Sequence, residues 1–188
     1  MSECDRALLA RAQRFIRDVY VYTSGLLTEL PEGEVAVREV AEGVLRLLEN
    51  PRGVYLAYYP ATPVFFIGFA LSYTFILRPR GARRARRGRV VFIVLFEPCR
   101  QLSDAELRYV LVHELVHASA YEEEVSADLL AEVLVVRFPE YFAPPDKSRL
   151  RAVRQVDMLR LERLVEERPL HLARRFLRCS AALRPMRA

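Results

Sequence analysis

Apolar residues recur at the three- and four-residue spacing of a helix in two segments at the start of the chain. The first segment is residues 3–30, and the second, residues 34–49, ends at the sequence Asn-Pro-Arg-Gly of residues 50–53. Pro31 and Gly33 separate the two segments. The periodicity predicts two helices that each bury one face.

A different pattern follows, because residues 54–77 contain no charged residue and are rich in side chains that favour strands. A run of this length could also cross a bilayer. Pro60 and Pro63 interrupt it, so we predict two or three buried strands with a break at residues 59–62, and a membrane span is the less favoured alternative. The apolar run of residues 90–96 predicts a further buried strand.

Two more helices are predicted in the middle of the chain. Ser103 and Glu106 form a capping box, so a helix is expected from about residue 104 to about residue 118. Ser119 and Glu122 form a second box, so the next helix is expected to run to about residue 138. Its predicted apolar stripe consists of Val125, Leu129, Val133 and Val136. The short connection makes the two helices antiparallel neighbours.

The last part of the chain reads as helical. Residues 147–168 form a charged amphipathic pattern, and a final helix is expected to begin near Pro169. A length of 188 residues suits one domain. We therefore predict a single α+β domain, with N-terminal helices over 1–52, a sheet and central helices over 54–138, and C-terminal helices over 146–188.

One segment of the chain is especially dense in basic residues. The formal net charge is +5, and every basic residue except Lys147 is an arginine. Seven arginines lie within residues 78–89, between two strand-like runs. This segment suits phosphate binding, but no aromatic residue is interleaved to stack on bases. We interpret it as a solvated loop and assign it no nucleic-acid-binding residues.

The cysteines and the first residues of the chain indicate in which cellular compartment the protein is located. Cys4, Cys99 and Cys179 are odd in number and widely spaced, which predicts neither a disulfide framework nor a cysteine zinc site. The opening residues are charged and amphipathic, unlike a secretory signal. We therefore expect a reducing, cytoplasmic location. The arginine-rich, amide-poor composition favours a GC-rich or thermophilic source.

The sequence His-Glu-Leu-Val-His of residues 113–117 lies inside the predicted helix 104–118. Residues four apart share one helix face, so His113 and His117 can converge on one metal ion. Glu114 is offset by about 100° and can reach a metal-bound water without being a ligand. The alternative is a packed pair of histidines with a paired glutamate.

The next predicted helix offers a third ligand. Glu124 and Asp128 lie four residues apart, and Glu124 is expected to face the histidine pair. We prefer it to Glu122 and Glu123 because it alone has an aspartate at the fourth position after it. Asp128 could accept the N–H of a ligand imidazole and so fix its tautomer.

These two motifs together resemble the gluzincin zinc metallopeptidases, the thermolysin-like clan. Residues 124–128 are similar to the Glu-x-x-Ala-Asp form of peptidases related to the heat-shock protease HtpX, and the small size is similar to that of archaeal minigluzincins. The resemblance covers about residues 89–138. It implies a zincin-like fold, in which a small twisted sheet packs on the active-site helix, and a bound Zn²⁺ ion. The implied metal ligands are His113, His117 and Glu124.

The resemblance also implies hydrolysis of a peptide or protein substrate, with Glu114 as general base. Candidates for an oxyanion donor are Tyr121, Tyr141 and His171. Two alternatives stay open: a nucleic-acid-associated regulator that uses residues 78–89, and a catalytically silent zincin-like scaffold.

Overall fold

The computed structural model describes residues 4–60, 68–77, 86–119, 124–146, 163 and 166–187, and for residues 68–77, 86 and 87 it describes the backbone. These residues form five α-helices, a short 3-10 helix and four strands. The predicted α+β class is therefore confirmed.

The four strands form one mixed sheet in the order β2-β3-β1-β4. Their bounds are Val54–Tyr59 for β1, Gly68–Leu77 for β2, Arg86–Phe96 for β3 and Ser180–Ala182 for β4. The central pair, β1 and β3, is parallel, whereas β2 and β4 are antiparallel to their neighbours. No helix in the described ranges is both long and apolar enough to cross a membrane.

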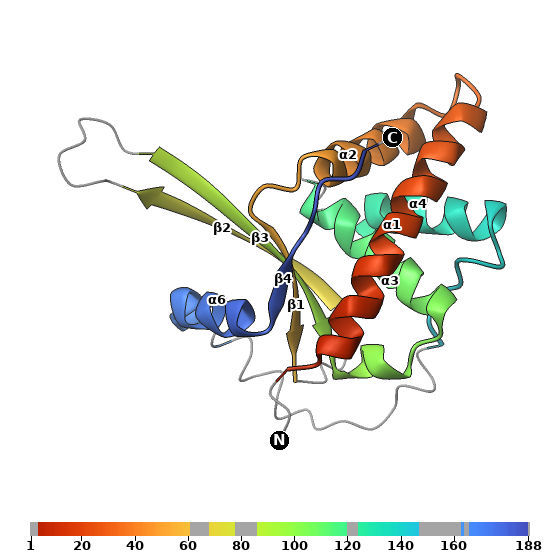
Figure 1. The fold of residues 1–188 in the computed structure, drawn as a ribbon. Helices are drawn as coiled ribbons and strands as arrows, with labels where there is room; N and C mark the ends of the chain where they lie inside the picture. Colours follow the sequence, from red (N-terminus) through yellow and green to blue (C-terminus); the bar gives the residue numbers. More distant parts are fainter. Residues whose placement is uncertain are drawn as a thin grey trace.

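The sheet separates two unequal layers (Figure 1). Helices α1 (Arg6–Glu29), α2 (Val35–Glu49), α3 (Asp104–Ala118) and α4 (Glu124–Arg137) cover one face, and α6 (Pro169–Arg178) covers the other. Because side chains alternate along a strand, Ile93 and Leu95 pack with the four-helix layer, whereas Phe92 and Val94 pack with α6.

Helix α3 lies at the centre of the larger layer and begins where the sequence predicts. The Ser103 hydroxyl accepts the Glu106 amide at 3.2 Å, and the Glu106 carboxylate accepts the Ser103 amide at 2.8 Å. The second oxygen of Glu106 accepts the Asp146 amide at 3.1 Å. The capping box therefore both starts the helix and ties down a distant loop.

The predicted apolar stripe of α4 is only half correct. Leu129 and Val133 are partly buried and pack against the core. Val125 and Val136 are 77% and 78% exposed. The buried residues are instead Ala127, Leu130, Ala131 and Leu134. Apolar residues lie on both sides of this helix, and the alanines allow a closer approach to α3, so the side with small residues faces inward. Glu122, the partner in the second predicted capping box, lies outside the described residues.

The arginine-rich segment, residues 78–89, is predicted to be a loop, but part of it is a strand. Strand β3 begins at Arg86, and residues 86–89 pair with residues 74–77 of β2. Residues 78–85 lie outside the described part of the chain. The C-terminal region also differs from the prediction. The final helix begins at Pro169 as expected, but β4 follows it, and most of the predicted helix 147–168 lies outside the described residues.

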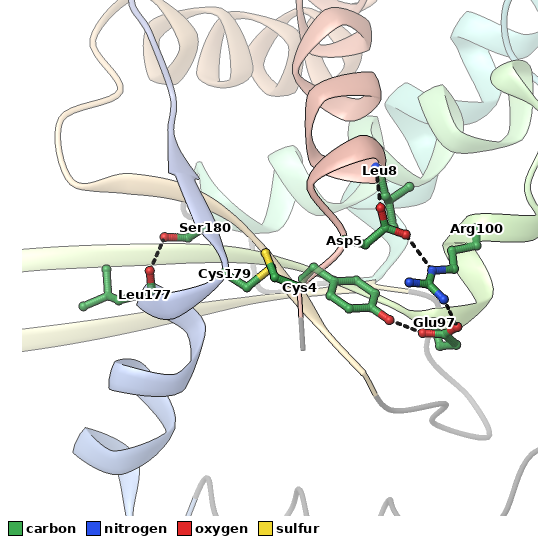
Figure 2. The surroundings of a disulfide bond; sticks show 9 residues. Cys4, Asp5, Leu8, Glu97, Arg100, Leu177, Cys179 and Ser180 are labelled. Atoms are coloured by element: carbon green, nitrogen blue, oxygen red, sulfur yellow. Dashed lines mark hydrogen bonds and ion pairs between the residues drawn. A yellow bond between two sulfur atoms is a disulfide. The ribbon is translucent and has the colours of Figure 1, made fainter. Parts of the chain in front are cut away.

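The expectation about cysteines is wrong, because Cys4 and Cys179 form a disulfide across 175 residues (Figure 2). The fold brings the start of α1 beside the junction of α6 and β4, with the two Cα atoms 5.2 Å apart. Sequence spacing carries no information about such an encounter. Disulfides persist in oxidising compartments and in intracellular proteins of hyperthermophiles. The argument for a reducing compartment therefore no longer holds.

Candidate metal centre

The candidate metal centre lies between α3 and α4, which run antiparallel as predicted. His113 of α3 contacts Asp128 of α4. One turn later on α3, His117 contacts Glu124, which lies one turn before Asp128 on α4. Four side chains at helical i, i+4 spacing thus face each other across one helix pair.

Three of these side chains converge at their donor atoms. The Nε2 atoms of His113 and His117 are 3.2 Å apart. The Glu124 carboxylate has one oxygen 3.3 Å from Nε2 of His113 and the other 3.4 Å from Nε2 of His117. The ligand atoms of all three residues lie within 4.8 Å of one another. This group can hold a metal ion.

Asp128 orients one of the histidines. Its carboxylate oxygen is 3.1 Å from Nδ1 of His113. An Nδ1–H that donates to this carboxylate leaves the Nε2 lone pair directed at His117 and Glu124. Asp128 therefore occupies the position behind His113 that the sequence predicts for it.

Burial favours the form of His113 that a metal needs. Desolvation lowers the pKa of His113 below its ordinary value of 6.5, and the neighbouring His117 lowers it further, against the opposing charges of Glu124 and Asp128. A lowered pKa keeps the imidazole neutral at pH values where an ordinary histidine begins to be protonated, and a neutral ring has the lone pair that binds metal.

The site is open to solvent on the α4 side. The side chains of His113 and His117 are 19% and 16% exposed, whereas that of Glu124 is 72% exposed. A ligand from solution therefore has access to the converging atoms from the side of Glu124.

Glu114 occupies the neighbouring position on α3 and is only 5% exposed. Burial raises the pKa of the Cys99 thiol, and the charge of Glu114 raises it further. Glu114 therefore lies within electrostatic reach of Cys99, in the 3-10 helix η1 (Glu97–Gln101) that follows β3. The Glu114 side chain is therefore buried, whereas that of Glu124 is exposed.

The two candidate oxyanion donors that the structure describes, Tyr141 and His171, pack elsewhere. His171 is in α6, which packs on the opposite face of the sheet. The ring of Tyr141 packs against Tyr22, with ring centroids 4.6 Å apart, and the Arg108 guanidinium lies over it at 5.9 Å. Tyr121 lies outside the described residues.

Two residues near the site belong to no predicted motif. Tyr109 is one turn before His113 on α3, and its pKa is raised by burial and by the charges of Asp128 and Glu132. The i, i+4 spacing from His113 could have identified it. Arg89 donates to the Ala118 carbonyl at 3.5 Å, at the end of α3. No sequence signal connects this β3 residue with the helix.

The chain matches no protein-family model, and no curated protein or solved structure matches it. The resemblance to gluzincins therefore depends on the motif residues alone.

Proposed function

We propose that the chain is a zinc-dependent peptidase. The observation that carries this proposal is the convergence of the donor atoms: the two histidine Nε2 atoms are 3.2 Å apart, and one Glu124 oxygen lies 3.3 Å from the first while the other lies 3.4 Å from the second. Tetrahedral ligands with zinc bonds of about 2.0–2.1 Å are separated by about 3.3 Å. Two histidines and one glutamate are also a donor set that catalytic zinc sites use, with the fourth position left for water or substrate.

The residues of the chain divide the work of hydrolysis between them. His113, His117 and Glu124 would hold the ion, and Asp128 would keep His113 in the required tautomer. When bound, zinc would polarise a substrate carbonyl and make a water molecule more acidic. Glu114 would accept a proton from the attacking water and transfer it to the leaving amine as the peptide bond breaks.

The sheet offers a place for the substrate backbone. Strand β2 is at the end of the sheet, so within the described residues only one of its two edges is paired. This strand also contacts α3, the helix that carries both histidines. An extended peptide that pairs with the open edge of β2 would lie along the side of the sheet next to α3.

Metal content and cleavage of an unstructured protein substrate, measured on matched variants, test this proposal. We expect the parent chain to bind one zinc ion and to cleave casein. Glu114→Gln should keep the metal but lose about a hundredfold or more in cleavage rate, because it removes the general base. Glu124→Gln should lose both metal and activity.

Glu132→Gln is the matched control, because Glu132 is exposed on the same helix as Glu124. It should behave as the parent chain does. A parent chain that binds zinc and cleaves no peptide would instead favour a catalytically silent scaffold. A Glu114→Gln variant as active as the parent would remove Glu114 from the mechanism.

A further inference from the structure

Helix α6 is attached to the sheet by one face only. Leu172, Ala173 and Phe176 are buried, and the Phe176 ring lies 5.4 Å from that of Phe92 and 5.7 Å from that of Tyr59, measured between centroids. Side chains at these positions share the inner side of the helix. They account for its docking, so the remaining surface of α6 is not needed to hold it in place.

The outer surface of α6 combines exposed leucines with exposed arginines. Leu170 is 60% exposed and Leu177 is 48% exposed. They lie seven residues apart and therefore on the same side of the helix. Arg174 and Arg178 are also exposed, and they follow Leu170 at i+4 and i+8. Leu170, Arg174, Leu177 and Arg178 thus form one continuous strip, which we call the α6 strip.

The α6 strip is cationic beyond its first turn, although the exposed Glu166 and Glu167 lie just before α6, within four residues of Leu170. Residues 168–187 contain six arginines and no acidic residue. Among the residues that the structure describes, Arg174 and Arg178 form no ion pair with a carboxylate. An anionic partner would therefore meet positive charge on the part of the strip that contains Arg174 and Arg178.

The leucines distinguish between the anionic partners. At a membrane surface, guanidinium groups bind lipid phosphates while neighbouring leucines enter the boundary with the acyl chains, so both kinds of side chain contribute. A nucleic acid would use the arginines, but it would gain little from leucines, and the α6 strip contains no aromatic ring to stack on a base. We infer that the α6 strip binds the surface of membranes that contain anionic phospholipid.

This binding mode leaves the candidate metal centre accessible. The sheet lies between α6 and the layer that contains α3 and α4 (Figure 1). A chain that rests on a membrane through the α6 strip would hold His113, His117 and Glu124 on the side away from the lipid. The inference does not depend on the proposed peptidase activity, because it uses no residue of that site.

Sedimentation with vesicles tests the inference on the full chain with its disulfide intact. We expect binding to vesicles of phosphatidylglycerol mixed with phosphatidylcholine and little binding to phosphatidylcholine alone. Arg174→Glu with Arg178→Glu should weaken binding by about tenfold or more, since each basic residue near an anionic surface contributes about 1 kcal/mol. Leu170→Ser with Leu177→Ser should weaken it severalfold.

Matched changes in the four-helix layer are the controls. Arg14→Glu with Arg17→Glu makes the same charge change on α1, and Val21→Ser with Val136→Ser removes two other exposed apolar side chains. Both pairs should leave vesicle binding within about twofold of the parent value. Circular dichroism should show every variant folded, since all eight side chains are exposed.

Three results would overturn the inference. The first is absence of binding to anionic vesicles by the parent chain. The second is equal binding to vesicles with and without phosphatidylglycerol. The third is a loss of affinity in the arginine variant with none in the leucine variant, which would indicate a purely electrostatic surface, such as one that binds nucleic acid.

Discussion

At the scale of single residues, Asp5 connects the start of α1 with the 3-10 helix η1. Its carboxylate accepts the Leu8 amide at 2.8 Å and so caps α1, and its other oxygen binds the Arg100 guanidinium at 2.6 Å. Arg100 also binds Glu97 at 2.7 Å (Figure 2). The start of α1 is thereby fixed to the 3-10 helix that leads into α3. One ionised carboxylate thus contributes to the position of the helix that carries the candidate metal ligands.

The charge of Asp5 should make stability depend on pH. Burial raises the pKa of Asp5, but the Leu8 amide and the Arg100 guanidinium stabilise the ionised form and lower the pKa below its ordinary value of 3.8. Because the folded-state pKa is the lower one, the contribution is complete above the unfolded-state pKa and is lost as the pH falls through the folded-state pKa. Asp5→Asn, which retains a capping side chain, should lower the free energy of unfolding at neutral pH by up to about 1 kcal/mol.

Urea unfolding at several pH values would measure this effect. The difference between the parent chain and Asp5→Asn should shrink below about pH 4, where the parent carboxylate becomes protonated. A difference that stays constant from neutral pH to acid would mean that the charge of Asp5 is irrelevant and that only its hydrogen-bonding shape matters.

At the scale of elements, the sequence predicts where a helix begins and ends, but it does not predict which face of a helix is buried. Helix α3 begins and ends as predicted, because a capping box and a histidine pair at i, i+4 are properties of neighbouring residues. His113, His117, Glu124 and Asp128 come together for a similar reason, because α3 and α4 are consecutive helices joined by only a few residues. The inner face of α4 and the strand β4 were missed, since both depend on which distant element lies opposite.

The turn before β1 depends on a glycine. Gly53 has a φ of +73°, and a Cβ there would lie 2.6 Å from the Arg89 carbonyl oxygen of β3. The Gly53 carbonyl also accepts the Val91 amide at 2.8 Å, so the turn is held close to the neighbouring strand. Gly53→Ala should reduce the free energy of unfolding by about 1–3 kcal/mol from the backbone strain alone.

Gly25 provides the opposite case for comparison. It lies inside α1, and a Cβ there would have no atom within 4 Å. Gly25→Ala should increase the free energy of unfolding by about 0.5–1 kcal/mol, because alanine has the higher helix propensity. Urea unfolding of both variants would test the contrast, and a Gly53→Ala variant as stable as the parent would show that the turn can relax.

At the scale of the whole molecule, the disulfide joins segments near both ends of the chain. Cys4 precedes α1, in the larger layer, and Cys179 follows α6, on the other side of the sheet. The Tyr58 amide of β1 donates to the Cys179 carbonyl at 3.0 Å, so the bonded cysteine is also attached to the sheet. The covalent bond therefore connects the two layers beside β4, at one edge of the described sheet.

Removal of this bond should destabilise the protein. A cross-link that closes a long loop restricts the unfolded chain, and native disulfides typically contribute about 2–5 kcal/mol. Reduction of the parent chain should lower its urea midpoint accordingly. Reductant should not change the midpoint of Cys4→Ser, which lacks the bond already. An equal effect of reductant on both proteins would mean that the bond contributes nothing.

The same bond also changes what a break in the backbone does to this protein. The loop that it closes contains every described helix and the strands β1, β2 and β3. Strand β4 and the residues after it lie outside the loop. If one peptide bond between Cys4 and Cys179 is cut, the two pieces stay covalently joined and can remain packed as before. A single internal cut would therefore convert the chain into a nicked molecule of unchanged mass apart from one added water, and not into two separate fragments.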